Sequence, residues 1–288
     1  MTGFVQSKIE LERDVQNELL NWKNKRHHTV LQIEGPWHVG KTHEVKKFVY
    51  SHYKQVVYVN LVRDEYGFED LMLTDHFMRE YCRNAGIGEY VDDESTVLVI
   101  DEIQERANVY NAIRDLREQL GCDIIVSGSY LARTVNSRDF FLPAGIAYLQ
   151  MYPLSFKEFC RALNIEDILE TISLKSESKD EDYQKLEEAY QVYRKIGGYP
   201  LVVTTFIESR QIDDCMVVLE DLIRTFTAES SRFFTNSTAL SIFQEAYKAV
   251  LVQIAEEKKG TGKTFLEFVT NFVKDTVKEP VSRNEVRT

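Results

Sequence analysis

The sequence has few of the features that mark secreted, membrane or fibrous proteins. Its 288 residues include four cysteines, five prolines and thirteen glycines. The cysteines are far apart and form no Cys-x-x-Cys pair, so we expect reduced thiols in a cytoplasm rather than a disulfide scaffold. No apolar run approaches the roughly 18 residues of a membrane span, and the N-terminus is mixed polar, so we expect neither a membrane helix nor a signal peptide. The low proline and glycine content excludes collagen-like and low-complexity classes.

Positive charge is also scarce. Lysine and arginine total 35 against 46 aspartates and glutamates, a net charge of -11. Such a surface repels phosphate backbones, which disfavours non-specific nucleic-acid binding, although a basic patch on one face could persist under the average. Hydrophobic residues make up 43% of the chain, enough for roughly two domains.

Short apolar runs alternate with segments of helical period up to about residue 151. The predicted strands are residues 30–33, 56–61, 97–100, 124–126 and 147–151. The predicted helices between them lie near residues 41–53, 68–84, 107–119 and 129–135. Strands separated by crossover helices are typical of an α/β fold with a parallel sheet, and their continuous apolarity predicts cover on both faces.

After Pro153 the pattern indicates helices only. They are expected at residues 155–163, 182–196, 199–209, 213–227 and 240–256, and the charged run 175–182 is expected to be a solvated loop. The predicted domains are an α/β domain over 1–153, a smaller all-helical domain over 154–230 and a helical C-terminal segment over 231–288. Residues 282–285 have the form of a capping box with three residues after it, so a frayed tail and the start of a truncated further domain both stay open.

A phosphate-binding loop follows the first predicted strand. Residues 35–42 match Gly-x4-Gly-Lys-Thr, with a strand before and a helix after. Gly35 and Gly40 let the backbone turn its N–H groups toward a polyanion, and the new helix adds the positive end of its dipole. Lys41 is expected to reach the β- and γ-phosphates, and the Thr42 hydroxyl to ligate Mg²⁺. The expected nucleotide-binding residues are Gly35, Pro36, Trp37, His38, Val39, Gly40, Lys41 and Thr42, of which Trp37 and His38 are expected to serve loop packing.

Polar side chains follow two later strands. Asp101 and Glu102 end an apolar run, at the edge where ligands bind in open parallel sheets. Asp101 is expected to hold Mg²⁺, and Glu102 to accept a proton from the water that attacks the γ-phosphate. The Ser127 hydroxyl is expected to hold that water or touch the γ-phosphate, with capping of a following helix as the alternative. An arginine after the acidic pair, from the same or a neighbouring subunit, could stabilise the transition state, but each alone is favoured to be solvated or ion-paired. The candidates are Arg106, Arg114, Arg117, Arg133 and Arg138.

These motifs together resemble the AAA-type branch of P-loop ATPases. They are similar above all to a prokaryotic group described as ATP-binding, through GPWHVGKT at 35–42, VLVIDE at 97–102, SGSYL at 127–131, PLSFKEF at 153–159 and GGYP at 197–200. The resemblance covers roughly residues 15–230. It implies strands in the order 5-1-4-3-2, a helical lid, ATP with Mg²⁺, and hydrolysis by the glutamate that matches Glu102.

The sequence departs from that family pattern in three places. Ala144-Gly145 stands where members often have Gly-Arg, which leaves Arg138 as an alternative arginine. His43 stands where a second Thr or Ser is common. Many members also continue into a further C-terminal domain, and this sequence ends before a complete one.

Two functions fit these motifs. The first is Mg²⁺-dependent ATP hydrolysis that drives a conformational change, and the alternative is a nucleotide-gated regulatory module with little or no turnover. A small-molecule kinase is disfavoured by Glu102 beside Asp101. ATP is the expected ligand, a second copy or another protein the expected partner, while the client, the oligomeric state and the source of an arginine finger stay open.

Overall fold

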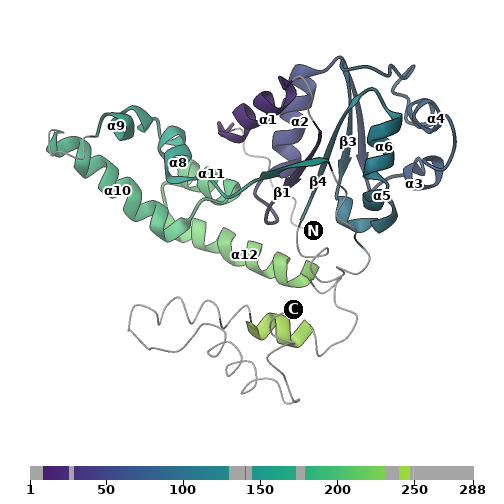
Figure 1. Ribbon diagram of the computed structural model, residues 1–288. Helices are drawn as coiled ribbons and strands as arrows, with labels where there is room; N and C mark the ends of the chain where they lie inside the picture. The colour runs from purple at the N-terminus through teal and green to yellow at the C-terminus, as the bar shows by residue number, and fades with distance from the viewer. Residues whose placement is uncertain are drawn as a thin grey trace. The chain divides into compact units, whose positions relative to one another are not determined.

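The computed structural model describes residues 9–25, 29–129, 140, 145–172, 179–230, 240–246 and 249 (Figure 1). Described residues up to Leu222 belong to one compact unit, and those from Ile223 onward belong to a second. The helix predicted near 129–135 lies outside these residues except for Ser129, and the capping-box match at 282–285 lies outside them entirely. The domain limits expected at 153 and 230 stay predictions.

The first unit contains a five-stranded sheet. Its strands are β1 (Val30–Glu34), β2 (Gln55–Asn60), β3 (Thr96–Asp101), β4 (Asp123–Gly128) and β5 (Ile146–Gln150). They lie in the order β2-β3-β4-β1-β5, and every neighbouring pair is parallel. Read from the other edge, this is the predicted order 5-1-4-3-2, so the α/β fold with a parallel sheet is confirmed.

Helices cover both faces of the sheet, as its apolar strands require (Figure 1). They are α1 (Val15–Lys23), α2 (Lys41–His52), α3 (Phe68–Leu71), α4 (Phe77–Asn84), the 3₁₀ helix η1 (Ile103–Glu105), α5 (Ala107–Asn111) and α6 (Ile113–Gln119). Alternate residues of a strand enter different cores. In β3, Val97 and Val99 pack with α1 and α2, whereas Leu98 and Ile100 pack with α3 to α6.

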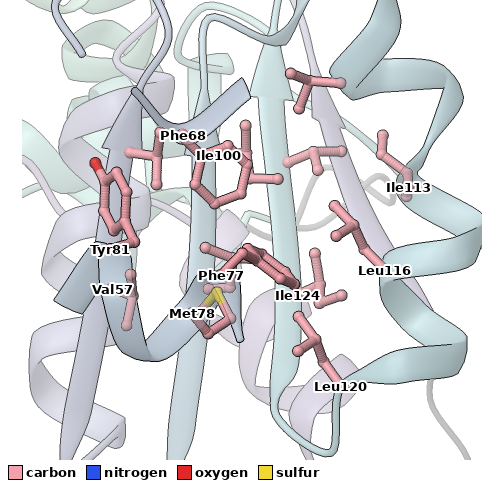
Figure 2. Close-up of a cluster of buried hydrophobic side chains, with 14 of the residues drawn as sticks. Val57, Phe68, Phe77, Met78, Tyr81, Ile100, Ile113, Leu116, Leu120 and Ile124 are labelled. Atoms are coloured by element: carbon pink, nitrogen blue, oxygen red, sulfur yellow. The ribbon is translucent and has the colours of Figure 1, made fainter. Parts of the chain in front are cut away.

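The second of these cores is drawn in Figure 2. Leu116 and Leu120 point from the α6 segment toward Ile124 of β4, while Phe68 lies beside Ile100 of β3. The rings of Phe68 and Tyr81 meet edge to face at 5.3 Å between centroids. Both aromatic side chains therefore fix the short helices α3 and α4 on the sheet.

The single helix expected near 68–84 is wrong. The structure has two short helices there, because the amide and the hydroxyl of Thr74 both donate to the carbonyl of Leu71, at 2.8 and 2.9 Å. That hydroxyl competes for a carbonyl that the helix would use. Leu73 is 83% exposed, so no buried face holds these residues in a longer helix.

Helices follow Pro153, as predicted. They are α8 (Phe156–Ala162), α9 (Glu166–Thr171), α10 (Asp180–Ile196), α11 (Pro200–Ser209) and α12 (Ile212–Ser230). A capping box starts α8, in which Ser155 and Glu158 bond each other's backbone N–H groups. The loop expected over 175–182 is wrong for Asp180 to Asp182, which form the first turn of α10 because carboxylates stabilise a helix N-terminus.

The second unit contains the end of α12, and residues 240–246 and 249 are helical. Phe226 and Phe243 pack there with their ring centroids 6.0 Å apart. Throughout the described part of the chain, no helix has the length and apolarity that crossing a membrane demands.

Two aromatic residues of α2 offer a matched test of the core. Phe48 is fully buried between the helix and the sheet, whereas Tyr50 is 64% exposed. We expect Phe48→Ala to lower the free energy of unfolding by about 3–5 kcal/mol, since it leaves a cavity. Tyr50→Ala should change it by less than about 0.5 kcal/mol. Urea unfolding followed by circular dichroism measures both, and equal losses would contradict this assignment of the core.

Candidate nucleotide-binding site

The carboxyl ends of three adjacent strands carry the predicted site. The phosphate loop follows β1, Asp101 ends β3, and Ser127 lies in β4, which pairs with both of these strands. Parallel strands place these ends at one edge of the sheet. The topology therefore brings together residues that are distant in sequence. Thr42 and Asp101 are 59 positions apart, and Asp101 and Ser127 are 26 positions apart.

The two glycines of the loop are needed for different reasons. A Cβ atom on Gly35 would lie 2.1 Å from the backbone oxygen of Met151, so only glycine allows the loop to approach the segment after β5. Gly40 has a φ of 93°, a left-handed conformation that favours glycine, directly before α2 begins at Lys41. The loop thus turns sharply into the helix N-terminus, as the sequence motif requires.

The remaining loop residues differ in exposure. Val39 is fully buried, Trp37 is half-buried, and Pro36 and His38 are exposed. His38 adopts a left-handed φ of 60°, although it is not glycine. Their expected contacts with nucleotide stay predictions.

The side chain of Lys41 lies across the loop. Its ammonium donates to the carbonyls of Gly35 at 2.9 Å and Pro36 at 2.8 Å. Burial lowers the pKa of Lys41 to about 8, against the charges of Glu102 and Asp101, which raise it. A polyanion beside this ammonium would favour its charged form, so the environment is suited to phosphate.

Asp101 is the most densely bonded residue of the site. Its carboxylate is 2% exposed and accepts hydrogen bonds from the hydroxyls of Thr42 (2.8 Å), Tyr58 (2.6 Å) and Ser127, and from the Glu102 N–H (3.1 Å). These donors come from α2, β2, β4 and the residue after β3. Tyr58 was missed by sequence analysis, because its only signal is its alternate position in a strand.

Glu102 is held in an unusual backbone conformation. Its φ is 58°, and its carboxylate accepts a hydrogen bond from the side-chain amide of Gln104 in η1. Burial raises the pKa of Glu102, and the bond from Gln104 opposes that change. The left-handed conformation of a non-glycine residue is a local strain of the kind found at functional sites.

Gln104 is the second residue that sequence analysis missed. It is 5% exposed, and its amide oxygen accepts from the Ser129 N–H at 3.1 Å. That bond forces the amide nitrogen, a donor only, toward Glu102. A Cβ on Gly128 would lie 2.4 Å from the amide oxygen, so the glycine of Ser-Gly-Ser makes room for Gln104.

Ser127 is fully buried and bonds to Asp101 rather than pointing to solvent. It lies inside β4, so it is not the residue directly before a helix, as the capping alternative required. Among the candidate arginines, Arg106 pairs with Glu69 and Arg114 with Glu118, each at 3.1 Å. Arg133 and Arg138 lie outside the described residues.

The residues present fit a magnesium ion. Mg²⁺ prefers oxygen ligands and is usually bound by one or two protein groups together with substrate phosphates. The Thr42 hydroxyl and the Asp101 carboxylate are such oxygens and lie in direct contact. The described residues contain no group of three or more His, Cys, Asp or Glu side chains that could hold a metal by themselves.

Comparison with known proteins finds one matching family model. Residues 27–160 match the family model described as "AAA domain". That stretch includes the phosphate loop, the acidic pair and all five strands. The match supports a nucleotide-binding domain of the AAA-type P-loop ATPases.

Individual relatives are more distant. Over 110 residues the chain is 29% identical to an uncharacterized protein of Haemophilus influenzae, a match over 38% of this chain and 24% of that protein. The chain thus spans about a quarter of this curated relative. A solved structure of a Walker-type ATPase of Pyrococcus abyssi is 13% identical with a TM-score of 0.48, covering 97% of this chain and 96% of that one. Aeropyrum pernix ORC1 in complex with DNA is 13% identical with a TM-score of 0.40, covering 97% and 82%.

Two serines near the end of β4 provide a matched test of the Asp101 contacts. Ser127 donates to Asp101, whereas the buried Ser129 hydroxyl has no hydrogen-bond partner among the described residues. We expect Ser127→Ala to lower the free energy of unfolding by about 1.5–3 kcal/mol, the value of a hydrogen bond to a charged group. Ser129→Ala should leave the free energy of unfolding unchanged or raise it, because a buried unpaired hydroxyl is unfavourable. Chemical denaturation compares the two, and a larger loss for Ser129→Ala would contradict the structure.

Proposed function

We propose that this protein binds ATP with Mg²⁺ and hydrolyses it, and that hydrolysis drives a conformational change. The observation that carries the proposal is the 2.8 Å contact between the Thr42 hydroxyl and the Asp101 carboxylate. It joins the phosphate loop to the acidic strand end, so one ion could be held by both. Mg²⁺ would neutralise charge that develops on the phosphates.

In this proposal each residue has a separate role. The loop amides and the N-terminus of α2 bind the phosphates, and Lys41 adds a positive charge beside them. Thr42 and Asp101 hold the ion. Glu102 accepts the proton of the attacking water.

The contacts favour Glu102 over Asp101 as the base. Asp101 already accepts four hydrogen bonds and is 2% exposed. Glu102 is half-buried, and its carboxylate accepts a hydrogen bond from the side chain of Gln104. Burial raises the pKa of Glu102, which moves a carboxylate closer to the proton affinity that a general base needs at neutral pH.

The helices after Pro153 are the proposed moving part. A Cβ on Gly40 would lie 3.8 Å from Pro200 at the start of α11. Because the loop and that helix are this close, a shift of the loop would displace the helix. The proposed partner is a second copy or another protein, and the net charge of -11 does not favour nucleic acid. The proposed location is the cytoplasm, which the four free, buried cysteines support.

Lys41 tests nucleotide binding. Lys41→Ala removes two charge-assisted contacts to phosphate, each worth about 1.5–3 kcal/mol, so we expect ATP affinity to fall by about 100-fold or more. Lys54→Ala changes an exposed lysine between α2 and β2 and should leave the affinity unchanged. Isothermal titration with ATP and Mg²⁺ measures both variants. Unchanged affinity in Lys41→Ala would refute the phosphate-loop assignment.

Glu102 tests hydrolysis separately. Glu102→Gln keeps the shape of the side chain but removes the base, so we expect phosphate release to slow by about 10²–10⁴-fold while ATP binding persists. A steady-state phosphate-release assay and a binding titration on the same samples give both quantities. Wild-type binding without turnover above background would replace the proposed ATPase with the nucleotide-gated module.

A further inference from the structure

Arg13 connects three segments that are distant in sequence. It lies just before α1, and its side chain is 5% exposed. Its Nη1 donates to the Val39 carbonyl at 3.2 Å, its Nη2 to the Tyr152 carbonyl at 2.7 Å, and its Nε to the Glu158 carboxylate at 2.9 Å. These partners belong to the phosphate loop, the segment after β5, and α8. No sequence motif includes this arginine.

The contact with Val39 fixes the orientation of one peptide of the loop. In a trans peptide the C=O and the N–H point in opposite directions, and the described residues contain no cis peptide bond. Because the Val39 carbonyl points to Arg13, the Gly40 N–H points away from it. Gly40 is the loop glycine directly before Lys41, where backbone N–H groups are needed for phosphate.

We propose that Arg13 is a positioning residue for nucleotide binding, which orients the Val39–Gly40 peptide and ties it to α8. This inference rests on the proposed function, since it assigns Arg13 to the same phosphate site. The guanidinium presents its donors in a rigid planar fork, so three partners in different directions fix its place. A lysine keeps the charge, but its three donors lie on one nitrogen and do not reproduce the spacing of Nε, Nη1 and Nη2 that reaches these partners.

The far end of the connection is equally well held. The Glu158 carboxylate accepts from the backbone N–H groups of Asp14 at 2.9 Å and Ser155 at 2.8 Å as well as from Arg13. Both charged side chains are at least nine-tenths buried. A buried ion pair stays fixed because separating it leaves an uncompensated charge. A displacement of α8 is therefore transmitted to the phosphate loop through one side chain.

Arg161 offers the matched control. It bonds to Asp14 at 2.8 Å and to Glu166 at 2.7 Å, so it also joins the segment before α1 to α8. None of its contacts reaches the phosphate loop. A purely structural role for these arginines predicts similar effects of both, whereas a positioning role predicts an effect on nucleotide for Arg13 alone.

The experiment compares the full-length chain with Arg13→Lys and Arg161→Gln. We expect Arg13→Lys to weaken ATP and ADP binding by roughly tenfold, the loss of about one oriented hydrogen bond, and Arg161→Gln to leave both within twofold. Hydrogen–deuterium exchange of residues 35–44 without nucleotide gives a second readout. It should be faster than wild type in Arg13→Lys only, and thermal melting reports the overall stability of each variant.

The outcomes separate this inference from the proposed function. Arg13→Lys with wild-type affinity and wild-type exchange in residues 35–44 would overturn the inference and leave the ATP site intact. Equal weakening in Arg161→Gln would overturn it as well, since the effect would then follow loss of stability. Faster exchange in Arg13→Lys supports the role of Arg13 in orienting the loop even if the wild type binds no ATP. Absence of ATP binding by the wild type would contradict the proposed function and leave this inference standing.

Discussion

The site depends on the hydrogen bonds that converge on the carboxylate of Asp101. Four donors from α2, β2, β4 and the residue after β3 converge on it, although it is 2% exposed. Burying a carboxylate costs free energy unless hydrogen bonds satisfy its oxygens. Moving any of these donors away would restore that cost, so the buried charge holds them in place. The hydrogen bond from Thr42, in the first turn of α2, thereby attaches the phosphate loop to β3 of the sheet.

Arg13 holds the same loop at a second position. Thr42 is bonded toward Asp101 and Val39 toward Arg13, so the loop is fixed at two positions three residues apart. Ordering a loop on binding subtracts from affinity, and a loop that is ordered beforehand avoids that cost. The Val39 carbonyl and the Thr42 side chain thus hold the loop on both sides of Lys41, and the first of these contacts is made by the N-terminal segment.

Much of the fold could be predicted from the sequence because its signals are local. The apolar runs gave all five strands to within two residues at either end, and the Gly-x4-Gly-Lys-Thr spacing located the turn into α2. Tyr58, Gln104 and Arg13 were not predicted, since their roles depend on partners that only the folded chain brings near. Arg13 and Glu158 are 145 positions apart, and nothing in either neighbourhood marks the pair.

The glycines show how the helical part reaches this site. A Cβ on Gly198 would lie 2.1 Å from the carbonyl oxygen of Leu154, and the Leu154 N–H donates to the Gly198 carbonyl at 2.6 Å. The PLSFKEF motif at 153–159 and the GGYP motif at 197–200 thus contact each other through their backbones. Gly35 approaches Met151 just as closely, only three residues before Leu154. One short segment therefore touches the phosphate loop at its beginning and the start of α11 at its end, and any side chain added at either glycine would push the loop and the helices apart.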